Sequence, residues 1–296
     1  MSALTTTAGG RELWQGVSAR CVSVVHIFTT AGGHDVVALR GVNLDIRAGE
    51  QVALLGPSGS GKSTLLNLLA GVLRPSAGRI LIDGQDISRA DEVRLGRLRA
   101  STMAYLLQGA GRNLVPYLDA VTNVEWARQG LSATRRRSLP TAEELLRRLG
   151  LDDLPAHPVE RLSPGERQGV ALAAAMSAGA GLLLADEPTS QLGHEDRDRM
   201  LDLFDRLNRE FGTTVVIVTH DPEVSARIQR SITIRGGRIG REGRLGADYG
   251  VVDEDGAVHL PEEVAERFPA GTLVRFEATA DGVLVTPARD AGGATP

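Results

Sequence analysis

The chain has 296 residues, 42% of them hydrophobic, and a formal net charge of −4 at pH 7. It is long enough to bury a real core in one large domain or two smaller ones, and its mildly acidic balance argues against a general nucleic-acid binder. The single cysteine, Cys21, excludes an internal disulfide framework, and we expect it to be a small buried side chain rather than a nucleophile.

The ends and apolar runs of the chain indicate how it is organised. Residues 1–17 lack the apolar core of a signal peptide and are expected to form a flexible N-terminus. The longest apolar run, residues 170–185, contains small residues and a glycine break, so it predicts a helix, a turn and a strand rather than a membrane span. We therefore expect a soluble, cytoplasmic chain.

A glycine-rich loop between a predicted strand and a predicted helix is the strongest pattern in the chain. QVALLG predicts a buried strand, TLLNLLAGVL predicts a helix, and GPSGSGKST between them fits G-x-x-x-x-G-K-[ST] at every fixed position. Backbone N–H groups of such a loop close around phosphate oxygens, and the helix N-terminus adds partial positive charge. The predicted phosphate-binding residues are Gly56, Pro57, Ser58, Gly59, Ser60, Gly61, Lys62, Ser63 and Thr64.

Two side chains of this loop are expected to have special roles. Lys62 would reach the β- and γ-phosphates of a nucleotide, and the Ser63 hydroxyl would join a Mg²⁺ shell. Lys62 is also the only lysine among the 33 basic residues, since all the others are arginine. Arginine and lysine interchange on most solvated surfaces, so a retained lysine suggests a need for a compact ammonium group.

Residues 161–169, RLSPGERQG, predict the start of a helix. Ser163 suits the N-cap, Pro164 suits the first helical position, and Glu166 completes a capping box. The following VALAAAMSAGA is rich in helix formers. Taken alone, this pattern indicates only the start of a helix. Whether the segment also has a functional role has to be judged from the other motifs of the chain.

Two further predicted strands end in polar residues. GLLLADEPTS places Asp186 and Glu187 after one apolar run, and TTVVIVTHD places His220 after another. Ligands bind at the carboxyl ends of strands in open α/β sheets. Beside a phosphate loop, Asp186 would support Mg²⁺ through water, Glu187 would act as general base on the attacking water, and His220 would meet the γ-phosphate. Each signal alone is also explained structurally, by a helix N-terminus or a strand end.

With these motifs in this order, the chain resembles the ATP-binding subunits of ABC transporters over roughly residues 18–240, and the ATPase domain is expected at 18–245. GPSGSGKST is similar to Walker A, LLLADE to Walker B, VTHD to the switch-histidine loop, YLLQ to the glutamine loop and RLSPGERQ to the signature loop. The resemblance implies an α/β fold with a RecA-like parallel core sheet, an antiparallel β subdomain and a helical subdomain at about 97–175. It also implies that Gln108 contacts nucleotide and Mg²⁺, and that Phe28 stacks on adenine; a core phenylalanine remains the alternative for Phe28.

In this family the signature segment contacts the ATP that is bound by the Walker A loop of another subunit. The resemblance therefore implies a homodimer around two ATP molecules, with Ser163, the Gly165 backbone and Glu166 at each shared site. The chain departs from the usual pattern where Pro164 replaces a signature glycine and Gly193 stands where an aspartate is usual. Gly169 and Ala174 also replace two arginines of the signature helix. We expect hydrolysis at a modest rate.

The amino-acid sequence around the Walker A motif is similar to that of the ATPases of the lipoprotein-releasing and macrolide-exporter group. That similarity implies a separate integral membrane subunit as partner, and a peripheral position on the inner face of the cell membrane. The alternative is a soluble, non-transport ABC ATPase with a regulatory or nucleic-acid-related role. Such proteins usually contain two ATPase cassettes in one chain, a long coiled coil or zinc-binding cysteines, and this sequence has none of these. Nucleic acid is therefore not an expected partner.

After residue 245 the composition changes. Residues 246–290 predict two strands around a DG turn, a short helix and a further hairpin, and Asp and Glu outnumber Arg by ten to three. A unit of this size buries too little to be stable alone. It resembles the AbrB-like swapped-hairpin fold, which implies a dimerisation or regulatory module, and its acidic balance opposes phosphate binding. Residues 291–296 are expected to be a flexible end.

Overall fold

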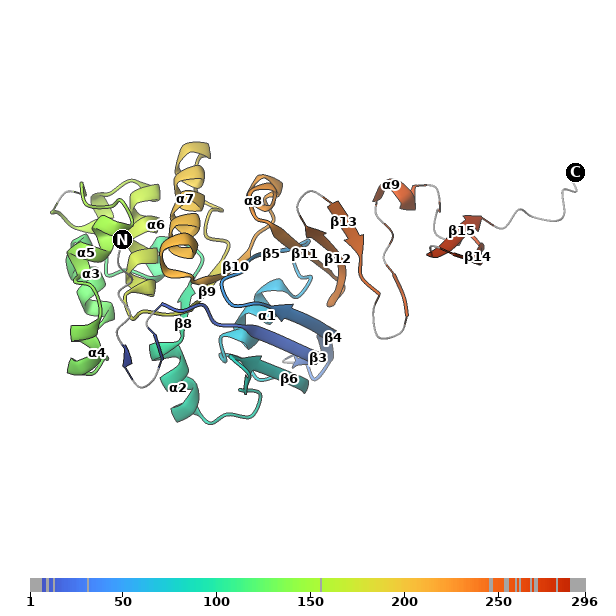
Figure 1. The fold of residues 1–296 in the computed structure, drawn as a ribbon, viewed down its shortest axis with the longest axis horizontal. Coiled ribbons are helices and arrows are strands. Elements are labelled where there is room, and N and C mark those ends of the chain that lie inside the picture. Colours follow the sequence, from blue (N-terminus) through green and yellow to red (C-terminus); the bar gives the residue numbers. More distant parts are fainter. Residues whose placement is uncertain are drawn as a thin grey trace, which may run out of the picture.

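The structure is a computed structural model. It describes residues 7–8, 11–12, 14–30, 32–154, 156–244, 247–252, 256–258, 260, 262–266, 268, 271–280 and 282–287. Figure 1 shows a main body of sheets and helices, from which the C-terminal segment extends to one side. The expected flexible end at 291–296 lies outside the described residues.

A seven-stranded sheet runs through the main body (Figure 1). Five neighbouring strands are parallel, in the order β11-β5-β10-β9-β8, and β12 and β13 continue the sheet antiparallel at one edge. The central strands are almost wholly apolar and buried, as expected for parallel strands covered on both faces. The strands are β5 (Gln51–Leu55), β8 (Met103–Leu106), β9 (Leu182–Asp186), β10 (Thr214–Val218), β11 (Arg230–Arg235), β12 (Arg238–Arg244) and β13 (Ala247–Gly250).

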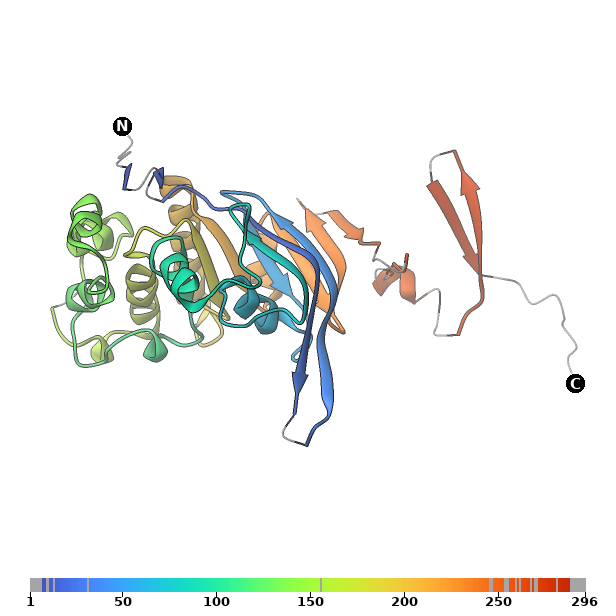
Figure 2. The ribbon, with the colours of Figure 1, turned by 90° about the horizontal axis from the view of Figure 1, so that it is seen from below.

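A second, antiparallel sheet has the strand order β4-β3-β6-β7. Leucines of α1 fill a hydrophobic core with this sheet and one face of the main sheet, and Cys21 belongs to that core. Cys21 is buried, as predicted, and burial raises the pKa of its thiol to about 12. Figure 2 shows the β3–β4 hairpin projecting beyond the body. The elements are β3 (Ala19–Thr29), β4 (Asp35–Ile46), α1 (Lys62–Leu69), β6 (Ala77–Ile82) and β7 (Gln85–Asp86).

Helices cover the other face of the main sheet and form a lobe at one end of the body (Figure 1). The expected helical subdomain at 97–175 includes β8, which the structure places in the main sheet, so the helical lobe begins after this strand. The fold class predicted from the sequence is confirmed. These helices are η1 (Ala110–Arg112), α3 (Ala120–Ala127), α4 (Ala133–Ser138), α5 (Ala142–Arg148), η2 (Val159–Arg161), α6 (Pro164–Met176), α7 (His194–Phe211) and α8 (Pro222–Arg227). In contrast, α2 (Glu92–Ser101) buries Leu95 in the same core as the leucines of α1.

The N-terminal segment packs onto the body earlier than expected. Two short strands, β1 (Thr7–Ala8) and β2 (Arg11–Glu12), pair with each other. Trp14 is buried and stacks on Phe211 with ring centroids 4.5 Å apart. The Val17 N–H then donates to the Gly181 carbonyl at 3.2 Å. The chain is therefore anchored from Trp14 onward, because burying a large aromatic ring offsets the entropy of ordering the segment.

The C-terminal segment begins on the main sheet. The expected boundary at residue 246 falls between β12 and β13, which pair along Arg241–Arg244 and Ala247–Gly250. Beyond them lie a bridge between Val252 and Val258, the helix α9 (Glu262–Ala265), and a hairpin of β14 (Val274–Thr279) and β15 (Gly282–Pro287). Among the described residues, no helix has both the length and the apolar character needed to cross a bilayer.

Candidate functional site

The glycine-rich loop closes tightly between β5 and α1. Gly56, Gly59 and Gly61 have φ angles of 141°, 77° and 105°, in the region that favours glycine. A Cβ atom on Gly56 would lie 2.2 Å from the Ile234 carbonyl oxygen, and one on Gly61 would lie 2.7 Å from the Ala38 carbonyl oxygen. Gly56 and Gly61 therefore need glycine for space as well as for conformation, and Gly59 needs it for conformation alone.

Lys62 opens α1 and is buried at the centre of the loop. Its Nζ donates to the Gly56 carbonyl at 2.7 Å and to the Pro57 carbonyl at 2.9 Å. These two bonds leave one ammonium proton for a ligand. The Ser60 hydroxyl oxygen is buried and, among the described residues, has no hydrogen-bond partner. The loop thus combines an ammonium group, a free polar atom and a helix N-terminus, which suit an anion.

Ser63 and Asp186 bring two oxygen atoms together beside the loop. The Ser63 hydroxyl donates to Asp186 Oδ1 at 3.2 Å, joining the start of α1 to the end of β9. Burial raises the pKa of Asp186, while the Ser63 bond acts in the opposite direction. Hydroxyl and carboxylate oxygens are the donors that Mg²⁺ prefers, so this pair fits the ion. In the described part of the chain, no three His, Cys, Asp or Glu side chains could hold a metal unaided. Nucleotide and water oxygens would have to complete the shell.

Glu187 and His220 meet at the ends of neighbouring parallel strands. His220 Nδ1 lies 2.9 Å from Glu187 Oε1, although the residues are 33 positions apart. Glu187 is held in a left-handed conformation with φ of 46°, and its N–H donates to the Val218 carbonyl at 2.9 Å. A strained non-glycine backbone of this kind is typical of functional sites. Glu187 Oε2 is buried and has no hydrogen-bond partner among the described residues, so it can accept a proton.

The loop around Gln108 connects to the same strand end. The Gln108 amide donates to the Ser190 hydroxyl at 3.4 Å, and Ser190 in turn donates to the Glu187 carbonyl at 3.0 Å. Asn113, which belongs to none of the sequence motifs, holds this loop by donating to the carbonyls of Leu107 and Gly109 at 2.9 Å and 3.0 Å. Gln108 is therefore tied to Glu187 through Ser190.

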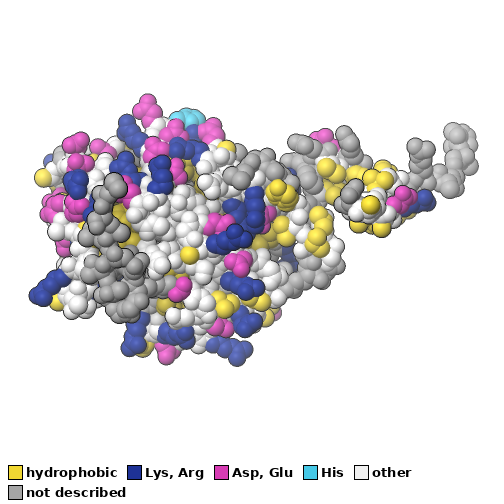
Figure 3. Space-filling model, viewed as in Figure 1, with side chains coloured by type: hydrophobic (Ala, Val, Ile, Leu, Met, Phe, Trp, Pro, Cys, Tyr) yellow, Lys and Arg dark blue, Asp and Glu magenta, His cyan; other side chains and the backbone are white. Residues whose placement is uncertain are grey.

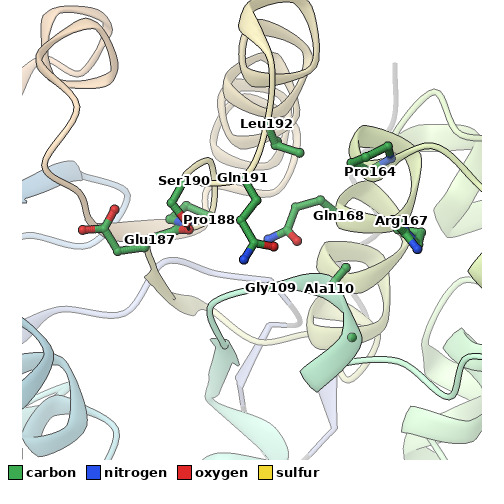
Figure 4. Close-up of a pocket in the computed structure, with 11 residues that line it drawn as sticks. Gly109, Ala110, Pro164, Arg167, Gln168, Glu187, Pro188, Ser190, Gln191 and Leu192 are labelled. Carbon is green, nitrogen blue, oxygen red and sulfur yellow. Dashed lines mark hydrogen bonds between the residues drawn. The ribbon is translucent and has the colours of Figure 1, made fainter.

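A cavity of about 170 Å³ lies beside this connection (Figure 4). Loop residues 109–111, the start of α6 and residues 187–192 line it. Figure 4 shows the side chains of Gln168 and Gln191 pointing toward one another, whereas the Glu187 carboxylate points away from both. Gln168 is buried, and its Nε2 has no hydrogen-bond partner in the part of the chain that the structure describes. Neither glutamine was predicted from the sequence.

The segment around Ser163 forms the predicted capping box. Glu166 N–H donates to Ser163 Oγ at 3.2 Å, and Ser163 N–H donates to Glu166 Oε2 at 2.8 Å. The bond from the Ser163 backbone lowers the pKa of Glu166. The Ser163 hydroxyl keeps its own proton for an external acceptor. A Cβ atom on Gly165 would lie 2.3 Å from the Asp196 carboxylate, so α7 packs directly on this glycine.

Phe28 and the capping-box segment are not among the groups at the strand ends. Phe28 is on the projecting β3–β4 hairpin, 40% exposed, with its ring edge-to-face to His26 at 4.5 Å. Both views place the start of α6 apart from α1 (Figures 1 and 2). The structure therefore brings Lys62, Ser63, Asp186, Glu187 and His220 together at the carboxyl ends of the central parallel strands. The residues around Ser163 form a separate surface of the same chain.

Comparisons with known proteins identify the family of the chain. A model of the ABC transporter family matches residues 39–190. The macrolide export ATP-binding/permease protein MacB 1/2 of Paracoccus denitrificans is 44% identical over 211 residues, which are 71% of this chain and 31% of that protein. MacB of Escherichia coli K12 is 40% identical over 211 residues, 71% of this chain and 32% of that protein. The chain thus spans about a third of the length of these curated relatives.

Solved structures of separate cassettes match over almost their whole length. An ATP-binding cassette in a dimeric post-hydrolysis state with ADP and phosphate is 34% identical, with a TM-score of 0.66 over 77% of this chain and 99% of that chain. The cbiO1 protein of Clostridium perfringens, part of an ABC transporter complex, is 27% identical, with a TM-score of 0.66 over 76% of this chain and 88% of that chain. Family match, relatives and fold agree: the chain belongs to the ABC transporter family and carries its ATPase cassette.

Proposed function

We propose that the chain binds ATP with Mg²⁺ at the Lys62 loop and hydrolyses it with Glu187 as the general base. The observation that carries this proposal is the 2.9 Å contact between His220 Nδ1 and Glu187 Oε1, next to the Ser63–Asp186 pair. Lys62 would exchange its bonds to the Gly56 and Pro57 carbonyls for phosphate oxygens. Phe28 would stack on adenine, and Ser58, Gly59, Ser60 and Thr64 would line the phosphates together with Gly61.

The proposed step is an in-line attack of water on the γ-phosphorus. Glu187 Oε2 accepts a proton from the water, the bond between the γ-phosphorus and the β–γ bridging oxygen breaks, and ADP and phosphate are released. His220 orients Glu187 through Oε1 and lies ready to donate to the γ-phosphate. Mg²⁺, when bound, neutralises charge on the phosphate oxygens, and Ser63, Asp186 and Gln108 are its proposed holders.

We propose a homodimer in which each ATP lies between the Lys62 loop of one chain and the Ser163 segment of the other. The Ser163 hydroxyl and the Gly165 N–H would donate to the γ-phosphate, and the start of α6 would contribute its partial positive charge. Glu166 keeps the Ser163 backbone in place. Pro164 removes one N–H donor at this helix start, which is consistent with modest turnover. The solved cassette that is dimeric and bound to ADP and phosphate supports the proposal of a nucleotide-binding dimer.

A separate membrane subunit is the proposed partner, since the matched relatives are ATP-binding/permease proteins in which the matched 211 residues make up only about a third of the length. Tyr117 and Trp126, on the helical lobe after the Gln108 loop, expose large aromatic side chains suited to such a contact. The cassette would then lie in the cytoplasm against the inner face of the membrane. A soluble, nucleic-acid-related role has no supporting observation in the described chain. Co-purification after mild detergent extraction tests the partner, with Trp126→Ala expected to reduce its recovery.

We further propose that the part of residues 246–290 beyond β13 forms an AbrB-like module that joins two chains. The β14–β15 register places Val274, Phe276 and Ala278 opposite Pro287, Val285 and Val283, so one face of the hairpin is entirely apolar. Figure 3 shows hydrophobic side chains gathered along this part of the chain. A two-stranded hairpin with an uncovered apolar face is marginal in water, and a second copy of the hairpin would cover it.

Glu187→Gln tests the hydrolysis proposal. The variant keeps the shape of the side chain and its contact with His220 but cannot accept the proton. We expect ATP binding within about twofold of the parent, turnover reduced by about 10²-fold or more, and a trapped dimer in ATP and Mg²⁺. Asp186→Asn is the matched control. It alters the neighbouring carboxylate, which is proposed to hold Mg²⁺, and leaves the proposed base Glu187 unchanged. Normal turnover in Glu187→Gln would exclude Glu187 as the base.

A further inference from the structure

Arg197, in the first turn of α7, is joined to the residue that follows His220. Its Nη1 lies 3.0 Å from Asp221 Oδ2, and the two side chains are only 12% and 26% exposed. Its Nη2 also contacts the side chains of Glu223 and His194. Because little water reaches the Arg197–Asp221 pair, solvent screens it less than a surface ion pair.

Asp221 uses both carboxylate oxygens. Oδ1 accepts the Glu223 N–H at 2.9 Å and so caps α8, while Oδ2 accepts from Arg197. The Asp221 N–H donates to Thr219 Oγ1 at 3.0 Å. The loop that carries His220 is therefore held between the end of β10, the start of α8 and Arg197. Arg197 is the contact that reaches it from α7.

The position of α7 gives this contact its significance. The helix starts at His194, directly after the segment that leaves Glu187 and passes Ser190 and Gly193. Gly193 brings no side chain to this segment, and the Arg197 N–H donates to its carbonyl at 2.9 Å. This segment therefore connects Glu187 covalently to Arg197. The ion pair of Arg197 with Asp221 then connects it to the residue that follows His220.

We propose that Arg197 is a positioning residue that sets the His220–Glu187 contact by holding Asp221 against α7. This inference rests on the proposed roles of Glu187 and His220 in hydrolysis. Loss of the guanidinium would leave the Asp221 carboxylate without its cation and free the loop to shift His220. A displacement of about 1 Å at a reacting group can lower the rate by about 10²-fold.

Arg227 provides a matched control. It joins the same two helices, since its Nη2 lies 2.7 Å from Asp202 and 3.5 Å from Asp205 of α7. At 38% exposure it is more accessible than Arg197, and within the described residues it forms ion pairs with Asp198, Asp202 and Asp205 rather than with Asp221. Removing either arginine loosens α8 from α7, but only Arg197→Met releases the residue beside His220.

The experiment measures kcat, the ATP dissociation constant and thermal stability for Arg197→Met, Arg197→Lys and Arg227→Met. We expect Arg197→Met to lower kcat about 10- to 100-fold with ATP affinity within about twofold, because the Lys62 loop is untouched. Arg227→Met should keep kcat within about twofold. Arg197→Lys should recover part of the loss, since an ammonium restores the charge but not the forked geometry. Equal losses of kcat in Arg197→Met and Arg227→Met would overturn the proposal.

A double-mutant cycle separates this inference from the proposed function. If Arg197 acts through His220, Arg197→Met should lower kcat by less than about twofold in a His220→Ala background. A full additional loss there would refute the inference. Normal kcat in His220→Ala alone would instead refute the proposed role of His220. If His220→Ala has no measurable turnover, the ¹⁵N shifts of the His220 ring give the second measurement. They should move in Arg197→Met and stay in Arg227→Met, and the reverse pattern would reject the proposal.

Discussion

Phe276→Ser is expected to dissociate the proposed nucleotide-free dimer. Phe276 lies on the apolar face of the β14–β15 hairpin and is 68% exposed in the single chain. Fully burying a phenylalanine contributes about 1.5–3 kcal/mol, so covering the exposed two thirds contributes about 1–2 kcal/mol per chain. A symmetric dimer loses this contribution twice. The expected rise in the dissociation constant is therefore about 30- to 1,000-fold.

Light scattering and sedimentation on the empty, full-length chain measure this change. Leu284→Ser is the matched control, because Leu284 pairs with Glu277 on the other face of the same hairpin and is 50% exposed. It removes a comparable apolar side chain and should change the dissociation constant far less. A parent chain that is monomeric without nucleotide at about 10 μM or above, or a larger effect from Leu284→Ser, would refute a dimer built on the apolar face.

Three further changes test other parts of the chain. Lys62→Ala should lower ATP affinity by about 100-fold or more in a calorimetric titration, since it removes the only ammonium group at the loop and its bonds to Gly56 and Pro57; near-parental affinity would contradict the phosphate-loop assignment. Trp14→Ala should lower the free energy of unfolding in urea by about 3–5 kcal/mol, because Trp14 is buried against Phe211. A decrease of less than about 1 kcal/mol would show that the N-terminal segment is not anchored. The lowered pKa of Glu166 gives stability that is present above its ordinary value of 4.5 and lost as the pH falls through the folded value. The stability difference between the parent and Glu166→Gln should therefore shrink below about pH 4.5, and a difference that grows with acidity would reverse this assignment.

The sequence alone predicted the local parts of this protein. The phosphate loop needs glycines where φ is positive, and Gly56, Gly59 and Gly61 stand at those positions. The capping box at Ser163 and Glu166 is a relation between residues three apart, so its pattern is readable directly and is present in the structure. The strands that end at Asp186 and Val218 were predictable because buried parallel strands are short and wholly apolar.

Only the tertiary structure decided how distant groups meet. The contact between His220 and Glu187 depends on β10 lying directly beside β9, and that neighbour relation follows from the packing of whole helices over the sheet. Packing also brought Trp14 onto Phe211, Asp196 against Gly165 and Arg197 onto Asp221. Helix and strand periods describe which face of an element is apolar, but they carry no information about which other element covers it. Contacts between residues far apart in the chain therefore had to come from the fold itself.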